Sequence, residues 1–578
     1  MIPAEKQAFM QQVRSLKKLV EASENGPSSA VKSLLHIWQK KQFPLLCKQL
    51  PRAELAFVEY ERIAELASWL SERPFLEAVF WLSSAYAIWV GNEIRSEKSL
   101  YFTPPLLAER LIDDLVAQGA SLVDHVWIDP ACGGGAFLAP VAVRMIDALE
   151  KKKVEAHDIV SKISNNILGN DIDSTLSYLS TQYLLMALYK NIETSKYMPT
   201  IKISNGDGLR TNICGGRQAD VIICNPPYRK MKSVEVDKYI GAYSDVIEGQ
   251  PNIYSLFIHQ CLKIGKPGSL VGLLTPTSYL SGRYFSKLRR IILKEASVCQ
   301  LDLVDDREGV FIDVSQDAVL SLYKRNTHEL QNPSPTEVYA LAIAGSFTKI
   351  GSCSLNLCKD AWPIPRQQGD QEIINRSAGS PYRLADYGFS PRIGTYVDYR
   401  DTRKTYTRQP NNKTMKAVFP IIWSSDITPD GNFVHGRTSK KDRHHIFIEM
   451  GTNDHRAVIR RPVIAMQRVT SPDQPRRLVC AEVDDDFVAR HQGVVGENHV
   501  IFLEQTSTRP PLSKRQFAAL LASEPIDRLF RSISGSVNVS ISELNQLALP
   551  DPKLLTELIN KGSSLDDAVI EAFKRTIE

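Results

Sequence analysis

The sequence predicts an α/β protein whose middle region forms a mostly parallel sheet with helices on both faces. Short apolar runs alternate with helical patterns between residue 98 and about residue 326, and the runs are continuous, as in strands buried on both faces. The expected strands are Val126–Ile128, Ile167–Gly169, Ile201–Ser204, Val221–Cys224, Leu270–Leu274, Leu301–Val304 and Ala318–Tyr323. The expected helices include Ala136–Glu150, Ser174–Tyr189, Ile253–Ile264 and Tyr284–Glu295.

The regions before and after this one have different sequence patterns, so three domains are expected: residues 1–97, 98–328 and 329–578. The first is helical, because Ala53–Ser71 lacks Gly and Pro and Pro74 starts a second helical pattern. Four of the 7 tryptophans lie there, and core packing is their expected role. After the linker Asn326–Thr336 the chain is loop-rich with short β-like runs, which predicts a separate α+β recognition domain.

The composition is that of a globular protein, with 43% hydrophobic and 23% charged residues among 578. Apolar runs of membrane-spanning length and a secretory pattern are both missing from the sequence. The 9 cysteines are scattered without a CxxC pair, which favours a reduced, cytoplasmic protein without a structural metal. Neither a membrane nor a metal ion is an expected partner.

The net charge of +5 is small, but basic side chains cluster within residues 400–443 and 456–477. Such clusters are typical of a surface that binds a polyanion. A solvated protein surface would give the same pattern, and the charge alone does not separate the two interpretations.

The first motif with chemical content is Asp129-Pro-Ala-Cys-Gly133-Gly134-Gly135, which joins an apolar strand to a helix. Glycines let a backbone approach a ligand closely, although a tight structural turn would use them too. The spacing is not that of a dinucleotide site. An acid at the strand end suits a ligand with a charged amino group, such as the methionine part of S-adenosylmethionine.

Two more carboxylates follow the next strands. Asp171 ends the second strand, where a carboxylate can accept hydrogen bonds from ribose hydroxyls. Asp173 fits a helix N-cap better. Asp207, after the third strand, is a candidate acceptor for an adenine amino group. The long separation of Asp129 and Asp171 is attributed to a polar insert around Lys151–Asn166.

The fourth strand ends in Asn225-Pro226-Pro227-Tyr228. The Asn225 side-chain oxygen and the Pro226 carbonyl can accept the two N–H bonds of a planar amine, which favours a tetrahedral nitrogen with a free lone pair. Two prolines hold those acceptors rigidly. Tyr228 offers a face on which a base can stack. A rigid turn that only closes the strand is the plain alternative.

In this order the motifs resemble the gamma class of amino-methylating DNA methyltransferases, specifically the adenine-N6 enzymes of bacterial restriction–modification systems. Ser99-Leu-Tyr101-Phe-Thr103-Pro-Pro resembles the cofactor motif that precedes the glycine turn. The resemblance implies a Rossmann-like class I methyltransferase domain with a seven-stranded sheet and S-adenosyl-L-methionine as cofactor. The implied cofactor residues are Tyr101, Thr103, Asp129, Ala131, Gly133, Gly135, Asp171, Ile172, Asp207, Gly208 and Asn225. Gly134 replaces the serine of many members, a change that a backbone-binding turn is expected to tolerate.

The resemblance also implies a substrate and partners. Double-stranded DNA would be bound with the adenine flipped out and stacked between Tyr228 and Phe311, although Phe311 also fits a core position. Residues 229–250 would form a mobile loop over the DNA, and a restriction endonuclease would be encoded separately. The expected DNA contacts are Arg229, Lys230, Arg403, Lys404, Arg437, Lys440, Lys441, Arg460, Arg461, Arg468, Arg476 and Arg477.

Other functions remain open at this point. The same pocket serves cytosine-N4 methyltransferases, although serine in place of Asn225 would favour that base. Methyltransferases acting on RNA or on a protein amide share the motif but usually lack a basic C-terminal domain. A DNA-specificity protein that no longer turns over is the alternative outside enzymes.

Overall fold

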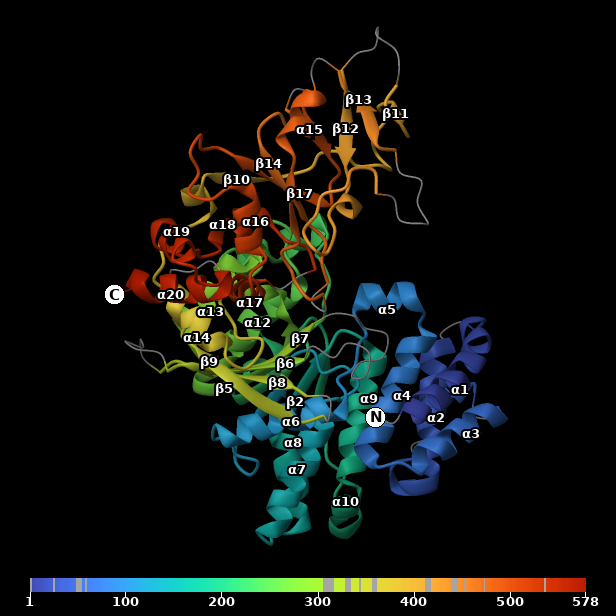
Figure 1. Ribbon diagram of the computed structural model, residues 1–578. Coiled ribbons are helices and arrows are strands. Elements are labelled where there is room, and N and C mark those ends of the chain that lie inside the picture. Colours follow the sequence, from blue (N-terminus) through green and yellow to red (C-terminus); the bar gives the residue numbers. More distant parts are fainter. Residues whose placement is uncertain are drawn as a thin grey trace. The chain divides into compact units, whose positions relative to one another are not determined.

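The computed structural model describes residues 3–23, 26–47, 55–57, 60–210, 212–304, 317–327, 334–342, 345–355, 361–410, 417–437, 445–451, 454, 456–471, 474–534 and 537–577. The chain divides into two compact units (Figure 1). The first comprises residues 1–279, 284–349 and 354–358, and the second comprises residues 280–283, 350–353 and 359–578. Each unit is described by itself.

A nine-stranded sheet organises the first unit, in the order β3-β2-β1-β4-β5-β7-β6-β8-β9. Strands β1 to β5 all run parallel to one another. Strand β7 runs antiparallel between β5 and β6, and β8 is parallel to β6. All seven predicted strands are confirmed, and β8 and β9 extend the sheet beyond residue 328. The strands are β1 (Trp127–Asp129), β2 (Ile167–Asp171), β3 (Lys202–Asn205), β4 (Ala219–Cys224), β5 (Gly265–Pro276), β6 (Ala296–Val304), β7 (Ala318–Arg325), β8 (Thr336–Leu341) and β9 (Phe347–Cys353).

Helices cover this sheet, since β1 and β2 are buried along their whole length. Helix α7 packs beside α6 and α9, and α12 packs beside α13, so the helices form two groups on the strands (Figure 1). The helices are α6 (Pro105–Ala117), α7 (Leu138–Lys151), α8 (Ala156–Asn166), α9 (Ser174–Ala187), α10 (Tyr189–Ser195), α11 (Ser233–Tyr243), α12 (Ile253–Ile264) and α13 (Ser286–Glu295).

Two segments of this region contain helices that are not among those expected from the sequence. The segment interpreted as a polar insert contains helix α8, because Ile159, Val160 and Ile163 lie on one face and are buried. The segment expected to be a loop over DNA contains helix α11, whose first turn is capped when the Glu235 carboxylate accepts from the Lys232 amide.

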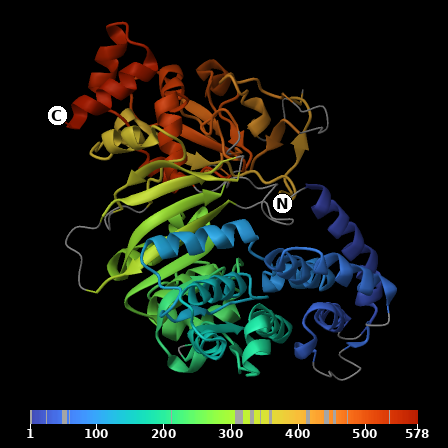
Figure 2. The ribbon, with the colours of Figure 1, turned by 90° about the horizontal axis from the view of Figure 1, so that it is seen from below.

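The N-terminal helices are α1 (Pro3–Glu21), α2 (Gly26–Gln42), α3 (Glu61–Ser71), α4 (Phe75–Trp89) and α5 (Asn92–Lys98). Their apolar residues belong to the same hydrophobic core as α7, α9 and the sheet. Figure 2 shows them, in blue, beside the helices of the sheet. Helix α4 is buried all round from Ala78 onward, and its tryptophans pack in the core as predicted.

Helix α4 also supports α9. The Tyr86 hydroxyl donates to the Asp173 carboxylate over 3.2 and 3.1 Å, and Asp173 caps α9 by accepting from the amides of Thr175 and Leu176. This N-cap role of Asp173 confirms the sequence interpretation. A buried amide pair from α2 reinforces the contact, with Gln39 Nε2 lying 2.9 Å from Gln182 Oε1. The N-terminal region is thus built into the unit that carries β1 and β2.

The second unit is α+β, as predicted. It holds two four-stranded sheets, in the orders β10-β17-β14-β15 and β11-β13-β12-β16. Its main core joins the first sheet to helices that include α16, α17, α19 and α20. The strands are β10 (Phe389–Ile393), β11 (Thr405–Tyr406), β12 (Val418–Ile422), β13 (Phe447–Glu449), β14 (Val463–Gln467), β15 (Cys480–Val483), β16 (Val495–Gly496) and β17 (Val500–Gln505). The helices are α14 (Asp370–Ser377), α15 (Asp485–Arg490), α16 (Lys514–Leu521), α17 (Glu524–Ile533), α18 (Ile541–Gln546), α19 (Pro552–Asn560) and α20 (Leu565–Ile577).

Among the described residues, no helix is both long enough and apolar enough to cross a membrane. The same residues contain no group of three His, Cys, Asp or Glu side chains placed to hold a metal ion.

Gly134 is required by helix α4, which the sequence did not indicate. A Cβ atom at residue 134 would lie 2.3 Å from Ser83 Oγ and 3.0 Å from Ser83 Cβ. We therefore predict that Gly134→Ser lowers the free energy of unfolding by about 1–3 kcal/mol, as overpacking does. Chemical denaturation of the variant measures the loss.

A compensating variant isolates the cause. Ser83→Gly combined with Gly134→Ser should recover most of the lost stability, because removal of the Ser83 side chain leaves room for a side chain at residue 134. If the double variant is as unstable as Gly134→Ser alone, the contact with Ser83 is not the reason for the glycine.

Candidate functional site

A cavity of about 510 Å³ opens where β1, β2 and β4 end, with β3 beside them. The strand order reverses between β1 and β4, so the loops after these strands diverge and leave a crevice. Its volume lies in the range of small-molecule sites. The predicted cofactor residues that line it are Tyr101, Thr103, Asp129, Ala131, Gly133, Asp171, Ile172, Asp207, Gly208 and Asn225.

Gly135 is the exception among the predicted cofactor residues. It does not line the cavity, and its φ of 71° favours glycine. A Cβ atom there would lie 3.1 Å from Ser180 Oγ, so the residue lets the turn approach helix α9 closely. The structure therefore gives Gly135 a packing role, and its contact with the cofactor stays a prediction.

Asp129 lies at the end of β1, only 1% exposed. Its Oδ1 accepts a hydrogen bond of 3.0 Å from the Ala131 amide. Burial raises the pKa of Asp129 to about 7, because a charge is costly in a dry site. A cationic partner would favour the ionised carboxylate, so the position suits a ligand ammonium group.

Asp171 joins the loops that follow β1 and β2. Its Oδ2 accepts from the Gly133 amide over 2.9 Å, and its Oδ1 accepts from the Asp173 amide over 2.8 Å. A carboxylate offers about four acceptor positions, so two remain for ligand hydroxyls. Burial raises the pKa of Asp171 to about 6, while these backbone hydrogen bonds oppose the rise.

Asn170 is a positioning residue that sequence reasoning missed. It is 3% exposed, and its Nδ2 lies 2.9 Å from the Gly206 carbonyl and 3.4 Å from the Pro130 carbonyl. Its own carbonyl accepts from the Cys132 amide over 2.9 Å. One buried residue therefore ties β2 to the loops after β1 and β3. Its place beside Asp171 at a strand end was the only available signal.

Asp207 has partners on helix α11. Its Oδ2 accepts from Lys238 Nζ over 2.9 Å and from the Tyr239 hydroxyl over 2.8 Å. Burial tends to raise the pKa of Asp207, but the hydrogen bonds from Lys238 and Tyr239 lower it on balance. The carboxylate predicted to meet the cofactor adenine is thus engaged by α11 in this structure, and both α11 residues line the cavity.

Asn225 is oriented by its amide nitrogen. Its Nδ2 donates to the Tyr101 carbonyl over 3.3 Å and to Thr103 Oγ1 over 3.1 Å. A carbonyl only accepts, so the contact fixes which side of the carboxamide is nitrogen. The Asn225 oxygen is therefore the acceptor that faces away from Tyr101, as the sequence interpretation requires.

The Tyr228 hydroxyl approaches two acceptors, Asn225 Oδ1 and the Leu274 carbonyl, the latter at 2.7 Å. Its one proton serves one acceptor at a time. Burial raises the pKa of Tyr228 well above its ordinary value, so the hydroxyl stays a neutral donor. The Tyr228 ring meets Tyr254 edge to face, with 6.1 Å between centroids. Phe311, the other predicted stacking residue, lies outside the described residues.

The cavity fits S-adenosylmethionine. Buried Asp129 and Asp171 supply acceptors for an ammonium group and for ribose hydroxyls. Ile172 is 71% exposed although it is apolar, and it lines the cavity, so a ligand ring would cover it. The buried Ser99 Oγ also lines the cavity and has no hydrogen-bond partner in the described part of the chain.

The comparisons with known proteins agree with this site. The fold aligns with the DNA-bound type IIL restriction-modification enzyme MmeI with a TM-score of 0.55, over 98% of this chain and 94% of that chain at 13% identity. This is the class I S-adenosylmethionine-dependent methyltransferase fold. Residues 165–311 match the model of the Eco57I restriction-modification methylase family. That segment is similar to restriction-modification methylases, and the cofactor is S-adenosylmethionine.

Curated relatives include two type II methyltransferases. The chain is 24% identical to M.PstI of Providencia stuartii over 59% of the present chain. It is 23% identical to M.BsuBI of Bacillus subtilis over 58% of the present chain. The alignments span 66% of each of these relatives.

The predicted DNA contacts differ in their surroundings. Six are exposed in the structure: Lys230, Lys404, Arg437, Arg460, Arg461 and Arg476. Arg229 forms a two-bond ion pair with Glu235, and Arg403 pairs with Asp401, so these charges are locally balanced. Arg468 is half-buried, with Nη1 2.9 Å from the Asn498 carbonyl. Lys440 and Lys441 lie outside the described residues.

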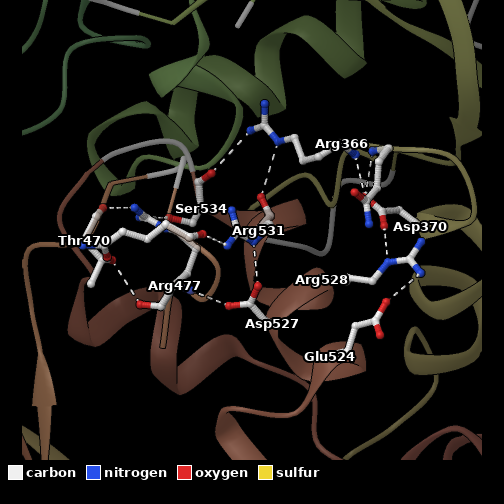
Figure 3. A network of polar contacts seen from close by, with 11 residues as sticks. Arg366, Asp370, Thr470, Arg477, Glu524, Asp527, Arg528, Arg531 and Ser534 are labelled. Carbon is white, nitrogen blue, oxygen red and sulfur yellow. Dashed lines mark hydrogen bonds and ion pairs between the residues drawn. The ribbon is translucent and has the colours of Figure 1, made fainter. Parts of the chain in front are cut away.

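Arg477 does not fit the predicted role of phosphate contact. It is 2% exposed, and its guanidinium donates to the Thr470 carbonyl and, over 3.2 Å, to Ser534 Oγ (Figure 3). Its amide donates to Asp527, whose other oxygen accepts from Arg531 Nε over 2.6 Å. Buried N–H groups must be hydrogen-bonded, and this network accepts several of those of Arg477. Arg477 therefore holds α17 against the loop before β15.

The raised pKa of Asp129 gives a pH prediction. Below a pKa of about 7 the ionised fraction falls, by about tenfold per unit well below it, so S-adenosylmethionine affinity should fall as the pH drops from about 8 to about 6. Calorimetric titration measures the dissociation constant at each pH. In Asp129→Asn the affinity should be lower at high pH and nearly flat until Asp171 titrates near 6.

Loss of folding does not imitate this effect. A carboxyl whose folded pKa is raised stabilises the fold more as the pH falls from 7 towards its unfolded value of about 4. Protonation of Asp129 therefore does not destabilise the fold over this pH range, and thermal melting at each pH checks this. A wild-type affinity that is constant from about pH 8 to about pH 6 would contradict the assignment of Asp129 to the ammonium group.

Proposed function

We propose that this chain is a site-specific DNA methyltransferase that transfers a methyl group from S-adenosylmethionine to adenine N6 in double-stranded DNA. It would act as the modification enzyme of a restriction–modification system, with any endonuclease encoded separately. The observation that carries the proposal is the orientation of Asn225, whose oxygen is presented as an acceptor at the edge of the cofactor cavity.

The chemistry follows from the acceptors at the end of β4. Bound cofactor supplies an electrophilic methyl group. An exocyclic amine delocalises its lone pair into the base and needs two acceptors to become nucleophilic. Asn225 Oδ1 and the Pro226 carbonyl are those acceptors, and Pro226 is buried and fixed in φ. No general base is needed, since the proton leaves after methyl transfer.

Tyr228 completes the pocket. When the substrate amine donates to Asn225 Oδ1, the Tyr228 hydroxyl keeps a partner in the Leu274 carbonyl. The exchange therefore leaves no buried hydroxyl unpaired, which would cost about 1–3 kcal/mol. Stacking of the flipped base on the Tyr228 ring is part of the proposal, and the edge of Tyr254 supports that ring.

Duplex DNA is the substrate that the likenesses favour. The chain is similar to type II methyltransferases, and the MmeI structure with the same fold was solved in complex with DNA. The exposed basic residues of the second unit supply phosphate contacts. Asparagine at residue 225 favours adenine over cytosine.

Expression of the chain in cells without DNA methylation, followed by single-molecule sequencing, tests the proposal. We expect N6-methyladenine at one short sequence throughout the genome. Unmodified DNA in cells that contain folded protein would contradict the activity, and N4-methylcytosine would contradict the base assignment.

The variant Asn225→Ala should lose methyl transfer by at least about a hundredfold, the effect of removing one preorganised transition-state contact. Cofactor binding should stay within a few-fold of wild type, because Asp129 and Asp171 are unchanged. Asn560→Ala, on the exposed end of α19, is the matched control. Methyl transfer near the control rate in Asn225→Ala would remove this side chain from the mechanism.

A further inference from the structure

Helix α11 adds two side chains to the cofactor cavity that the sequence motifs did not indicate. Lys238 and Tyr239 both line the cavity, together with Asp207 and Gly208 from the loop after β3. The two side chains bind the same oxygen of Asp207, since Oδ2 accepts from Lys238 Nζ over 2.9 Å and from the Tyr239 hydroxyl over 2.8 Å. The helix that follows the catalytic motif therefore reaches the carboxylate predicted to meet the cofactor adenine.

The three groups form a closed triangle, because Lys238 Nζ also lies 3.0 Å from the Tyr239 hydroxyl. That hydroxyl has one proton, so it donates to Asp207 and accepts from the lysine ammonium group. Hydrogen bonds between ionised groups are stronger than neutral ones. The Lys238 side chain is 52% exposed and the Asp207 side chain only 11%, so the carboxylate is the sheltered member of the pair. The triangle fixes the orientation of that carboxylate.

These contacts leave acceptor capacity on the other oxygen of Asp207. A carboxylate has about four acceptor positions, two on each oxygen. Lys238 and Tyr239 take both positions of Oδ2, and Oδ1 accepts from the Leu209 amide over 3.1 Å. One position on Oδ1 remains, which suits a single donor such as the exocyclic amino group of adenine. Burial tends to raise the pKa of Asp207, but the hydrogen bonds from α11 lower it on balance, so the group stays an acceptor at neutral pH.

Helix α11 is anchored at both of its ends. At its last residue, the Tyr243 hydroxyl lies 2.6 Å from the Leu209 carbonyl, and both residues belong to an apolar cluster separate from the main core. Near its start, Glu235 forms two hydrogen bonds of 2.7 and 2.6 Å with Arg229, the residue that directly follows the catalytic motif. The helix therefore connects the loop after β3 to the end of the catalytic motif.

We infer that Lys238 and Tyr239 are positioning residues for the cofactor adenine, because they hold Asp207 ready to accept from its amino group. The inference rests on the prediction that Asp207 recognises this amino group, and it does not depend on the DNA substrate. Since Arg229 holds the same helix, adenine binding would also stabilise the segment after the catalytic motif. In the opposite arrangement α11 blocks the adenine position, and the cofactor would have to displace Lys238.

Calorimetric titration of the full chain with two ligands that differ at one position of the purine tests the inference. S-adenosylhomocysteine, the demethylated cofactor, carries the amino group, whereas S-inosylhomocysteine carries a carbonyl oxygen, which cannot donate, in its place. The wild-type chain should bind the first ligand about tenfold or more tightly, since the second leaves the charged acceptor of Asp207 unpaired. The ratio of the two dissociation constants is the readout.

The double variant Lys238→Met, Tyr239→Phe removes both donors and keeps most of the side-chain volume on α11. The ratio should fall at least about threefold, chiefly through weaker binding of S-adenosylhomocysteine, because Asp207 keeps only the Leu209 amide. A merely structural role would weaken both ligands equally and leave the ratio unchanged. Tyr284→Phe is the matched control, since Tyr284 is 52% exposed and does not line the cavity, and it should keep the wild-type ratio.

Three results would overturn the inference. An unchanged ratio in the double variant would show that α11 does not orient Asp207. A larger ratio would show that α11 blocks the adenine position. Equal binding of both ligands by the wild-type chain would show that Asp207 does not meet the amino group. These titrations contain no DNA, so their failure is distinguishable from failure of the proposed function, which sequencing of methylated DNA tests separately.

Discussion

The two hydrogen bonds from the Asn225 amide nitrogen are the constraint on which the proposed chemistry depends. They link the end of β4 to the Tyr101 carbonyl and to Thr103 Oγ1, which precede helix α6. With the nitrogen held there, the carboxamide oxygen has only one orientation. A preorganised acceptor costs no rearrangement when the reacting amine arrives. Segment 99–103 is therefore both the edge of the cofactor cavity and the support of the catalytic side chain.

The N-terminal helices pack in the same hydrophobic core as the domain that carries that segment. Their apolar residues share one core with the sheet, and α4 contacts two parts of the cofactor site. Ser83 limits residue 134 in the glycine turn, and Tyr86 holds Asp173 next to Asp171. Lys98 donates to Asp173 over 2.8 Å and lines the cavity. A helical region without a recognisable motif thus determines the geometry of loops whose motifs are recognisable.

The sequence predicted the seven strands and ten of the residues that line the cavity, because local patterns encode both. Continuous apolar runs specify buried strands, and the motifs at their ends meet at one edge of a parallel sheet. The residues whose roles the sequence did not predict depend on contacts with residues distant in sequence. Gly134 is a glycine because of Ser83, Gly135 because of Ser180, and Arg477 is buried because Thr470, Ser534 and Asp527 accept its donors. Such partners are distant in sequence, so composition and spacing do not reveal them.

The Thr103→Val variant tests the central constraint most directly. Valine keeps the shape of threonine but removes the acceptor 3.1 Å from Asn225 Nδ2. In single-turnover methyl transfer with saturating cofactor and DNA, the account predicts a rate about tenfold below wild type. A carboxamide held by one hydrogen bond instead of two loses about 1–2 kcal/mol of orientation. Saturating cofactor separates this loss from any change in cofactor affinity, because Thr103 also lines the cavity. A wild-type rate in this variant would contradict the claim that the Asn225 amide is held in place for catalysis.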